Sequence, residues 1–293
     1  MTQRNHKSIN HQYLDLIDEV LTHGTNTSDR TGTGTRSVFA PRTRIEWDSL
    51  AAPVVTLKHL NVKSVFKELA WFILGHTNIK TLGCKIWDAW ARDDGECGPI
   101  YGAQWRGTGG GPDQLKNVLY GLRKNYNTRQ AVVSSWNPTD LPNMALPPCH
   151  TLYQLRDRDN NLDLQLYQRS ADVGLGVPFN ILSYYVLQAL CASYLGVTQG
   201  KLTIVYGDLH IYNNHMGPLK ELRENSQDKV AEQFREEPSF IVSPGLDEFF
   251  TMAIDDLHGI PKTLESVTEF ADLMAECLED FQQGPKIKLD VAV

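Results

Sequence analysis

Apolar residues recur at helical spacing in several stretches of the chain. Residues 8–22 place their apolar members three or four positions apart, namely Tyr13, Leu14, Ile17, Val20 and Leu21. Residues 63–75 and 180–196 are more continuously apolar and predict buried helices, which end at Gly75 and before Gly196. Residues 264–282 predict an acidic amphipathic helix.

Shorter segments have the composition of strands. They are rich in β-branched and aromatic residues with partial alternation, and they cover 36–48 (interrupted by Pro41), 130–136, 149–156, 162–169 and 201–212. The glycine-rich stretches 24–35 and 98–116 predict loops, and the last ten residues predict an extended segment. Because helices and strands mix without regular alternation, the pattern predicts one α+β domain over residues 1–293.

Composition and charge narrow the class of protein. With 41% hydrophobic and 22% charged residues, the 293-residue chain has the composition of a globular protein. No run of about 18 apolar residues predicts a membrane span, and the N-terminal residues lack the apolar stretch of a signal peptide, so we expect a cytoplasmic protein. The net charge of −7 argues against nucleic-acid binding.

The five cysteines are widely spaced and form no CxxC pair, so the sequence predicts neither a disulfide framework nor a metal site. Cys149 follows two prolines and precedes His150, which makes it a candidate nucleophile. The alternative is a small buried apolar residue. Adjacent strand residues point to opposite faces, so His150 is not automatically the base for Cys149.

Residues 168–180 bring four polar side chains close together in sequence. Arg169 and Ser170 suit a phosphate monoester. Asp172 adds a carboxylate, and Asn180 offers one donor and one acceptor to a pyrimidine edge. The alternative for Asn180 is an N-cap at the start of the helix. Because a free amide can flip, its chemistry alone leaves uracil and cytosine both open.

Three further groups are candidates. Asp208, His210 and Tyr212 alternate along a predicted strand and should share one face as a hydrogen-bonded site. Arg30 lies in a glycine- and threonine-rich segment that suits an anion. Glu68 lies in an apolar helix, where it is either solvent-facing or a buried carboxylate for proton transfer.

Seven motifs stand in order along the chain: DRTGTGT, KELAWFILGHTNI, KIWDAWA, GPIYGAQWR, MALPPCH, LYQRSADVGLGVPFN and GDLHIYNNH. Together they resemble the thymidylate synthase family, including its nucleotide hydroxymethylase branch, over residues 10–220 and again at the terminal KIKLDVAV. The resemblance implies a mixed β-sheet packed with helices and a homodimer formed through the sheet.

The resemblance also implies the chemistry. The substrates are a deoxypyrimidine monophosphate, dUMP or dCMP, and the folate co-substrate 5,10-methylenetetrahydrofolate. Cys149 attacks C6 of the base, and C5 then takes the one-carbon unit. Hydride at the resulting exocyclic methylene gives a methyl product, whereas water at the same carbon gives a hydroxymethyl product.

Roles follow for the matching residues. Those assigned to the nucleotide are Arg30, Arg169 and Ser170 at the phosphate, His210 and Tyr212 at the sugar, and Asn180 at the base. Arg129 matches an arginine that the family donates across its dimer interface to the partner's phosphate. Glu68, Tyr101 and His150 form a polar network for water and proton transfer. The residues assigned to folate are Lys58, Ile86, Trp87, Asp172, Leu175, Gly176, Phe179 and Val293.

Three departures from the family pattern bear on the product. Gln130 stands where a second arginine is usual, and His59 to Asn61 replace a basic run. Segment 220–285 diverges and ends in DFQQGPKIK, a changed tail that would let water compete with hydride. We therefore weigh methylation of dUMP against hydroxymethylation of dUMP or dCMP. Asn180 favours dUMP, because in the family asparagine accompanies uracil and aspartate accompanies cytosine. The catalytic-type residues argue against a non-catalytic binding protein.

Overall fold

A seven-stranded mixed sheet organises the computed structural model, which describes residues 7–124, 128–226 and 237–291. Its strand order is β1-β2-β7-β6-β5-β4. The remaining strand, β3, pairs with residues 202–204 of β7, before the part of β7 that pairs with β2. The strands are β1 (Thr25–Thr27), β2 (Thr35–Phe39), β3 (Ile45–Trp47), β4 (Val132–Ser134), β5 (His150–Arg158), β6 (Asn161–Asp172) and β7 (Thr198–Tyr212). All neighbouring strands in this order are antiparallel except β6 and β7, which are parallel and joined by a helix.

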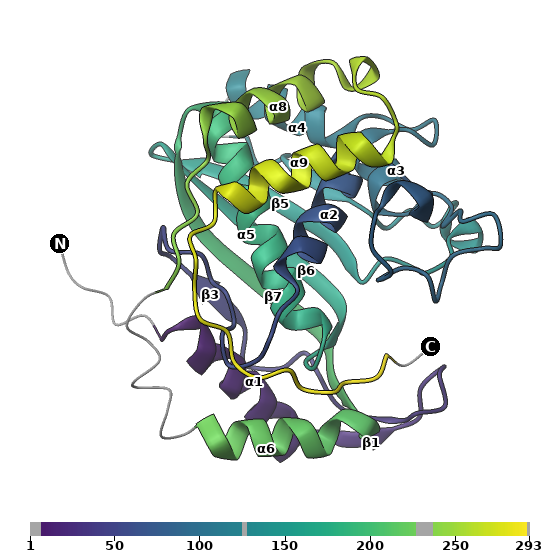
Figure 1. Cartoon of the computed structure of the whole chain (residues 1–293), viewed down its shortest axis with the longest axis vertical. Helices are drawn as coiled ribbons and strands as arrows, with labels where there is room; N and C mark the ends of the chain where they lie inside the picture. Colours follow the sequence, from purple (N-terminus) through teal and green to yellow (C-terminus); the bar gives the residue numbers. More distant parts are fainter. Residues whose placement is uncertain (1–6, 125–127, 227–236, 292–293) are drawn as a thin grey trace.

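Helices pack on the sheet and on one another (Figure 1). The α-helices of the described residues are α1 (Ile9–His23), α2 (Val62–Ile73), α3 (Tyr101–Arg106), α4 (Gln114–Lys124), α5 (Gly176–Leu195), α6 (Met216–Ser226), α8 (Pro244–Asp255) and α9 (Leu264–Glu276). Short 3-10 turns are η1 (Ile79–Thr81), η2 (Leu141–Asn143), η3 (Asn213–His215) and η4 (Leu257–Gly259). No helix among the described residues is long and apolar enough to span a membrane.

The α+β prediction and its main elements are confirmed, with four corrections. The predicted loop 24–35 contains the short strand β1. The predicted loop 98–116 contains α3 and the start of α4. Helix α3 contains Gly102, where a Cβ would lie 2.5 Å from the carbonyl oxygen of His76, so close packing requires a glycine at this position. The predicted helix 264–282 ends at Glu276. Helix α5 begins at Gly176, so Asn180 lies inside it and is not its N-cap.

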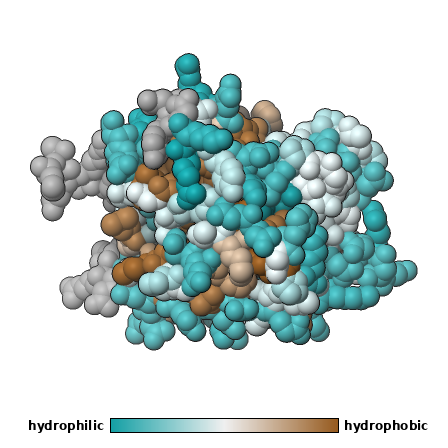
Figure 2. Space-filling model, turned by 90° about the horizontal axis from the view of Figure 1, so that it is seen from above, coloured by the Kyte–Doolittle hydropathy of each residue, from teal (hydrophilic) through white to brown (hydrophobic). Residues whose placement is uncertain are grey.

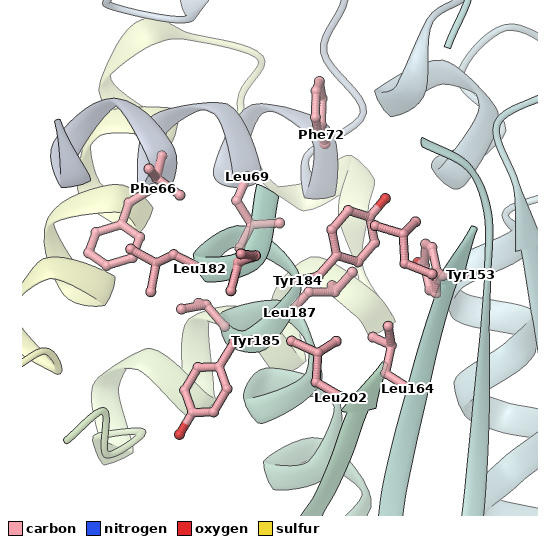
Figure 3. Packing of buried hydrophobic residues seen from close by; sticks show 14 of the residues in the cluster. Phe66, Leu69, Phe72, Tyr153, Leu164, Leu182, Tyr184, Tyr185, Leu187 and Leu202 are labelled. Carbon is pink, nitrogen blue, oxygen red and sulfur yellow. The ribbon is translucent and has the colours of Figure 1, made fainter. Parts of the chain in front are cut away.

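Helix α5 lies at the centre of the core. Almost all of its residues are buried, because it packs on β6 and β7 on one side and on α2 and α8 on the other. Figure 3 shows Leu182 and Leu187 of α5 between Leu69 of α2 and Leu164 and Leu202 of the sheet. A helix enclosed on all sides is apolar all round, which is why its sequence reads as a continuous apolar run.

Among the described residues, no helix covers the opposite face of the sheet along β5 and β6. Large apolar residues of β4, β5, β6 and the loop before β5 are partly exposed, namely Val132 (39%), Leu152 (38%), Tyr167 (37%) and Trp136 (38%). By contrast, the view from above is mostly hydrophilic, with its hydrophobic residues in small separate groups (Figure 2). The sheet therefore presents an open face that carries large apolar side chains.

Strand register brings polar residues from distant segments to one end of this sheet. His150 of β5 pairs with Gln168 of β6. Further along β6, Ser170 pairs with Asp208, and Asp172 pairs with His210. The ends of β5, β6 and β7 thus form the floor of one site.

Candidate active site

Cys149 lies directly before β5 and is held through its backbone. Its N–H donates to the Tyr101 hydroxyl at 2.7 Å, and its carbonyl accepts from the Arg169 N–H at 2.9 Å. The Arg169 guanidinium donates to the carbonyls of Pro147 and Pro148, at 2.8 Å each. Three segments of the chain therefore fix the position of the thiol.

The thiol is half-buried, and its surroundings have opposing effects on its acidity. Burial raises the pKa of Cys149 above its ordinary value. The positive charge of Arg169 and a hydrogen bond from Ser170 lower that pKa and offset part of the shift. Without substrate the thiol is therefore protonated at neutral pH, with a cation and a hydroxyl beside it that favour its thiolate.

His150 is buried and neutral. Burial lowers its pKa to about 4, and the neighbouring Asn180 amide offsets only part of this shift. Its ring packs against Tyr101, with centroids 5.2 Å apart, and against Tyr184 at 5.3 Å. A neutral imidazole serves as a hydrogen-bonding group in this site rather than as a cation.

Glu68 lies on α2 beside the segment around Trp87. The Trp87 indole N–H donates to the Glu68 carboxylate at 2.6 Å, and both residues are buried. Burial raises the pKa of Glu68 to about 7, although the hydrogen bond from Trp87 acts in the opposite direction. The Trp87 and Tyr101 rings lie 6.1 Å apart. Glu68 is thus the buried carboxylate of the two alternatives, connected through Trp87 and Tyr101 to Cys149.

Asp208, His210 and Tyr212 share one face of β7, as predicted. The His210 Nδ1 lies 2.8 Å from the Asp208 carboxylate, and the His210 and Tyr212 rings meet edge to face at 5.2 Å. Burial, with the charges of Asp172 and Asp29, raises the pKa of Tyr212 to about 12. Tyr212 therefore keeps its hydroxyl proton and remains a donor.

Asp172 ends β6 and accepts from the backbone N–H groups of Gly174 (2.9 Å) and Leu175 (3.2 Å). Two basic groups flank it. Burial lowers the pKa of Lys58 to about 8, and the Asp172 charge offsets part of that shift. The His215 Nδ1 lies 3.7 Å from the Asp172 carboxylate. Asp172 thus connects the site to two segments far away in sequence.

The remaining predicted residues differ in how close they lie to this centre. Ile86 and Phe179 are half-buried and apolar beside the core. At Gly176 an added Cβ would lie 3.5 Å from the Asn180 Oδ1, so this position suits a small residue. Arg30 is exposed near Tyr212, whose pKa its charge affects.

One predicted residue, Arg129, is not brought to the centre. Arg129 lies in the exposed loop before β4, where its carbonyl accepts from Gln154 at 2.9 Å and its guanidinium bonds no other described residue. Val293 lies outside the described residues.

The C-terminal segment after α9 lies along the chain near Lys58 and is held at both ends. At one end, Gly284 N–H donates to Thr56 O at 2.7 Å, and the Leu60 N–H donates to the Gln283 Oε1 at 2.7 Å. At the other end, the Asp290 carbonyl accepts from the His215 Nε2 at 2.8 Å, and from Asn214 at 3.1 Å. We call residues 283–290 the strap. The strap bridges residues 56–60 and η3, the segments on either side of Asp172.

A family model described as thymidylate synthase matches residues 11–293. The chain belongs to the thymidylate synthase family. The match runs through residues 220–285, so the expectation that the resemblance lapses there is wrong. Membership makes the protein a folate-dependent one-carbon transferase, and it agrees with a thiol, a buried carboxylate and an amide that converge on one site.

Two polar residues of the site were missed by the sequence analysis. Gln168 is 2% exposed and donates to Asn180. His215 is fully buried between Asp172 and the strap. The signal for Gln168 was its place among the inward-facing positions of a strand, where a polar residue needs a partner. His215 gave no such signal, because it lies in a 3-10 turn.

Trp87→Phe removes the indole donor to Glu68, so we expect the Glu68 pKa to rise above about 7. The carboxyl carbon chemical shift of Glu68, followed through a pH titration by NMR, measures this pKa. Trp90→Phe is the matched control, because the Trp90 indole N–H is buried and has no hydrogen-bond partner among the described residues. Equal Glu68 pKa values in wild type and Trp87→Phe would contradict the assignment.

Proposed function

We propose that this protein methylates dUMP at C5 to give dTMP, with 5,10-methylenetetrahydrofolate as co-substrate and residues 1–293 acting as one catalytic domain. The observation that carries the proposal is the half-buried Cys149 thiol beside Arg169 and Ser170. Family membership supplies the reaction class.

Cys149 is the proposed nucleophile. Its thiol loses its proton as substrate binds, and the Arg169 charge and Ser170 hydroxyl stabilise the thiolate. The thiolate adds to C6 of the pyrimidine, which makes C5 nucleophilic. Folate supplies the one-carbon unit and the hydride that reduces it. The Tyr101 hydroxyl accepts a hydrogen bond from the Cys149 backbone and so holds the nucleophile in place for the first step of the reaction.

Glu68 is the proposed group for proton transfer and water ordering. A carboxyl group with a pKa of about 7 exists in both protonation states near neutral pH, which suits a group that takes a proton and returns it. Trp87 keeps the carboxylate oriented. The neutral His150 extends the same polar network.

The nucleotide would bind along the ends of β6 and β7. Arg169, Ser170 and Arg30 suit its phosphate. His210 and Tyr212 suit the sugar hydroxyl, and Asp208 holds the His210 ring in place. Asn180 projects from the first turns of α5 toward the base position beside His150.

Folate would bind on the rim near Trp87. Half-buried Ile86 and Phe179, with Leu175, offer apolar surface to a planar ring. The Asp172 carboxylate suits the polar edge of a pterin. Lys58, which the resemblance assigns to folate, is buried beside Asp172, so here it would contact the same end of the molecule. These residues therefore fit a planar ring with a polar edge.

The strap supports methylation over hydroxymethylation. Its hydrogen bonds to residues 56–60 and to η3 hold it closed beside Asp172. Closing a site excludes water, and water is the competitor of hydride for the one-carbon unit. The altered tail sequence thus still forms a closed segment.

A homodimer formed through the open sheet face completes the proposed site. Large apolar side chains such as Trp136, Leu152 and Tyr167 lie partly exposed on that face, which is typical of an interface. Arg129 lies in a loop bonded to the same face through Gln154. There it would reach the phosphate bound by the partner subunit.

Mass spectrometry of the products tests the reaction directly. We expect a mixture of dUMP, dCMP and 5,10-methylenetetrahydrofolate to yield methylated uracil nucleotide, and Cys149→Ala to yield no nucleotide product. A product heavier by one oxygen would overturn methylation in favour of hydroxymethylation. A modified cytosine would overturn dUMP as substrate.

Gln283→Leu removes the acceptor for the Leu60 N–H at one end of the strap. A hydrogen bond of about 1 kcal/mol shifts the closure equilibrium about fivefold, so we expect the hydroxymethyl fraction of the product to rise by up to about that factor. Gln282→Leu is the matched control, since exposed Gln282 bonds no described residue. An equal product ratio in the two variants would exclude a role for this contact in water exclusion.

Mixing two inactive variants tests the shared site. Arg129→Ala and Cys149→Ala should each have low activity alone. In random heterodimers one of two sites keeps both groups, so the mixture should recover about a quarter of wild-type activity. Mixtures that form dimers but stay inactive would exclude the donation of Arg129.

A further inference from the structure

Gln168 is a buried polar residue with no role in the function proposed above. It lies on β6 opposite His150 of β5, with its side chain on the helix-covered side of the sheet and only 2% exposed. Its Nε2 donates to Ser170 O at 3.1 Å and to Asn180 Oδ1 at 2.9 Å. The buried Gln168 Oε1 has no hydrogen-bond partner among the described residues, so the two contacts of Nε2 are what fix the position of the carboxamide.

The Ser170 carbonyl determines which way the Gln168 amide faces. A backbone carbonyl only accepts hydrogen bonds, so the Gln168 atom beside it must be the nitrogen. That nitrogen directs its second hydrogen to Asn180. The Asn180 atom facing it must therefore be the oxygen.

This chain of bonds leaves the Asn180 Nδ2 as the group available to a ligand. Among the described residues, no hydrogen bond uses the Asn180 Nδ2, and Asn180 remains 7% exposed. Turning the amide would place the Nδ2 against the Gln168 Nε2, donor against donor. Asn180 is therefore not a freely flipping amide.

We propose that Gln168 is a positioning residue that holds the Asn180 carboxamide with its N–H donors toward the substrate, and so selects a pyrimidine with a keto oxygen at C4. This inference rests on the proposed function. The C4 oxygen of uracil accepts from the Asn180 Nδ2. The C4 amino group of cytosine would instead meet another donor, and both groups would lose their bonds to water.

Gln168→Met tests the proposal, because methionine has a similar length but cannot orient Asn180. Calorimetric titration with dUMP and with dCMP gives the ratio of their dissociation constants. We expect dUMP to bind more weakly to the variant. The preference of the protein for dUMP over dCMP should fall about five- to tenfold, which corresponds to the loss of one hydrogen bond. Gln188→Met is the matched control, since fully buried Gln188 on α5 bonds Leu162 and not Asn180.

If Gln168 served folding alone, Gln168→Met would weaken the binding of dUMP and of dCMP equally. An unchanged ratio of the two dissociation constants therefore overturns the proposal.

Side-chain amide NMR of the ligand-free protein tests the orientation of Asn180 without any nucleotide. We expect slow hydrogen exchange at the Gln168 carboxamide and fast exchange at that of Asn180. The reverse order would overturn the assigned orientation. If wild type binds neither nucleotide, the proposed function fails, while the exchange rates still decide the orientation.

Discussion

The pairing register of β6 is the constraint on which the rest of the site depends. Through it, Gln168 lies opposite His150, Ser170 lies beside Asp208, and Asp172 lies beside His210. A shift by one residue would turn every β6 side chain to the other face. Gln168 would then lose its contact with Asn180. The apolar residues of β6 that share its face would leave the core under α5. The same alternation therefore specifies the core and the polar site at its end.

Desolvation is what gives these polar groups their reactivity. Glu68 has a pKa of about 7 and His150 has one of about 4, in each case because burial disfavours the charged form. Burial opposes ionisation of Cys149 too, but there Arg169 and Ser170 act in the other direction. The candidate site thus keeps a neutral imidazole and a half-ionised carboxylate near a thiol whose ionisation is opposed by burial and favoured by Arg169 and Ser170.

The sequence predicted the parts of this arrangement that depend on local pattern, and missed those set by packing. Alternation along 201–212 placed Asp208 and His210 on one face, and the long apolar run predicted α5. Helix α3 was missed because its 6 residues are too short to carry a periodic pattern and glycines lie within it and on both sides. The fixed orientation of Asn180 was also out of reach. It depends on Gln168 and on a backbone carbonyl twelve and ten residues before it, which only the folded chain brings together.

The strap shows that hydrogen bonds of backbone groups can hold a segment in place beside Asp172. Segment 220–285 differs from the motifs seen earlier in the chain, yet the family match continues through it. The strap is bonded largely through backbone groups, among them Gly284 N–H to Thr56 O and the carbonyl of Asp290 to His215. Backbone bonds do not depend on which side chain a residue carries. Most side chains of such a segment can therefore change without loss of these bonds. Gly284 and the Gln283 amide are the exceptions, because they contact Thr56 and Leu60.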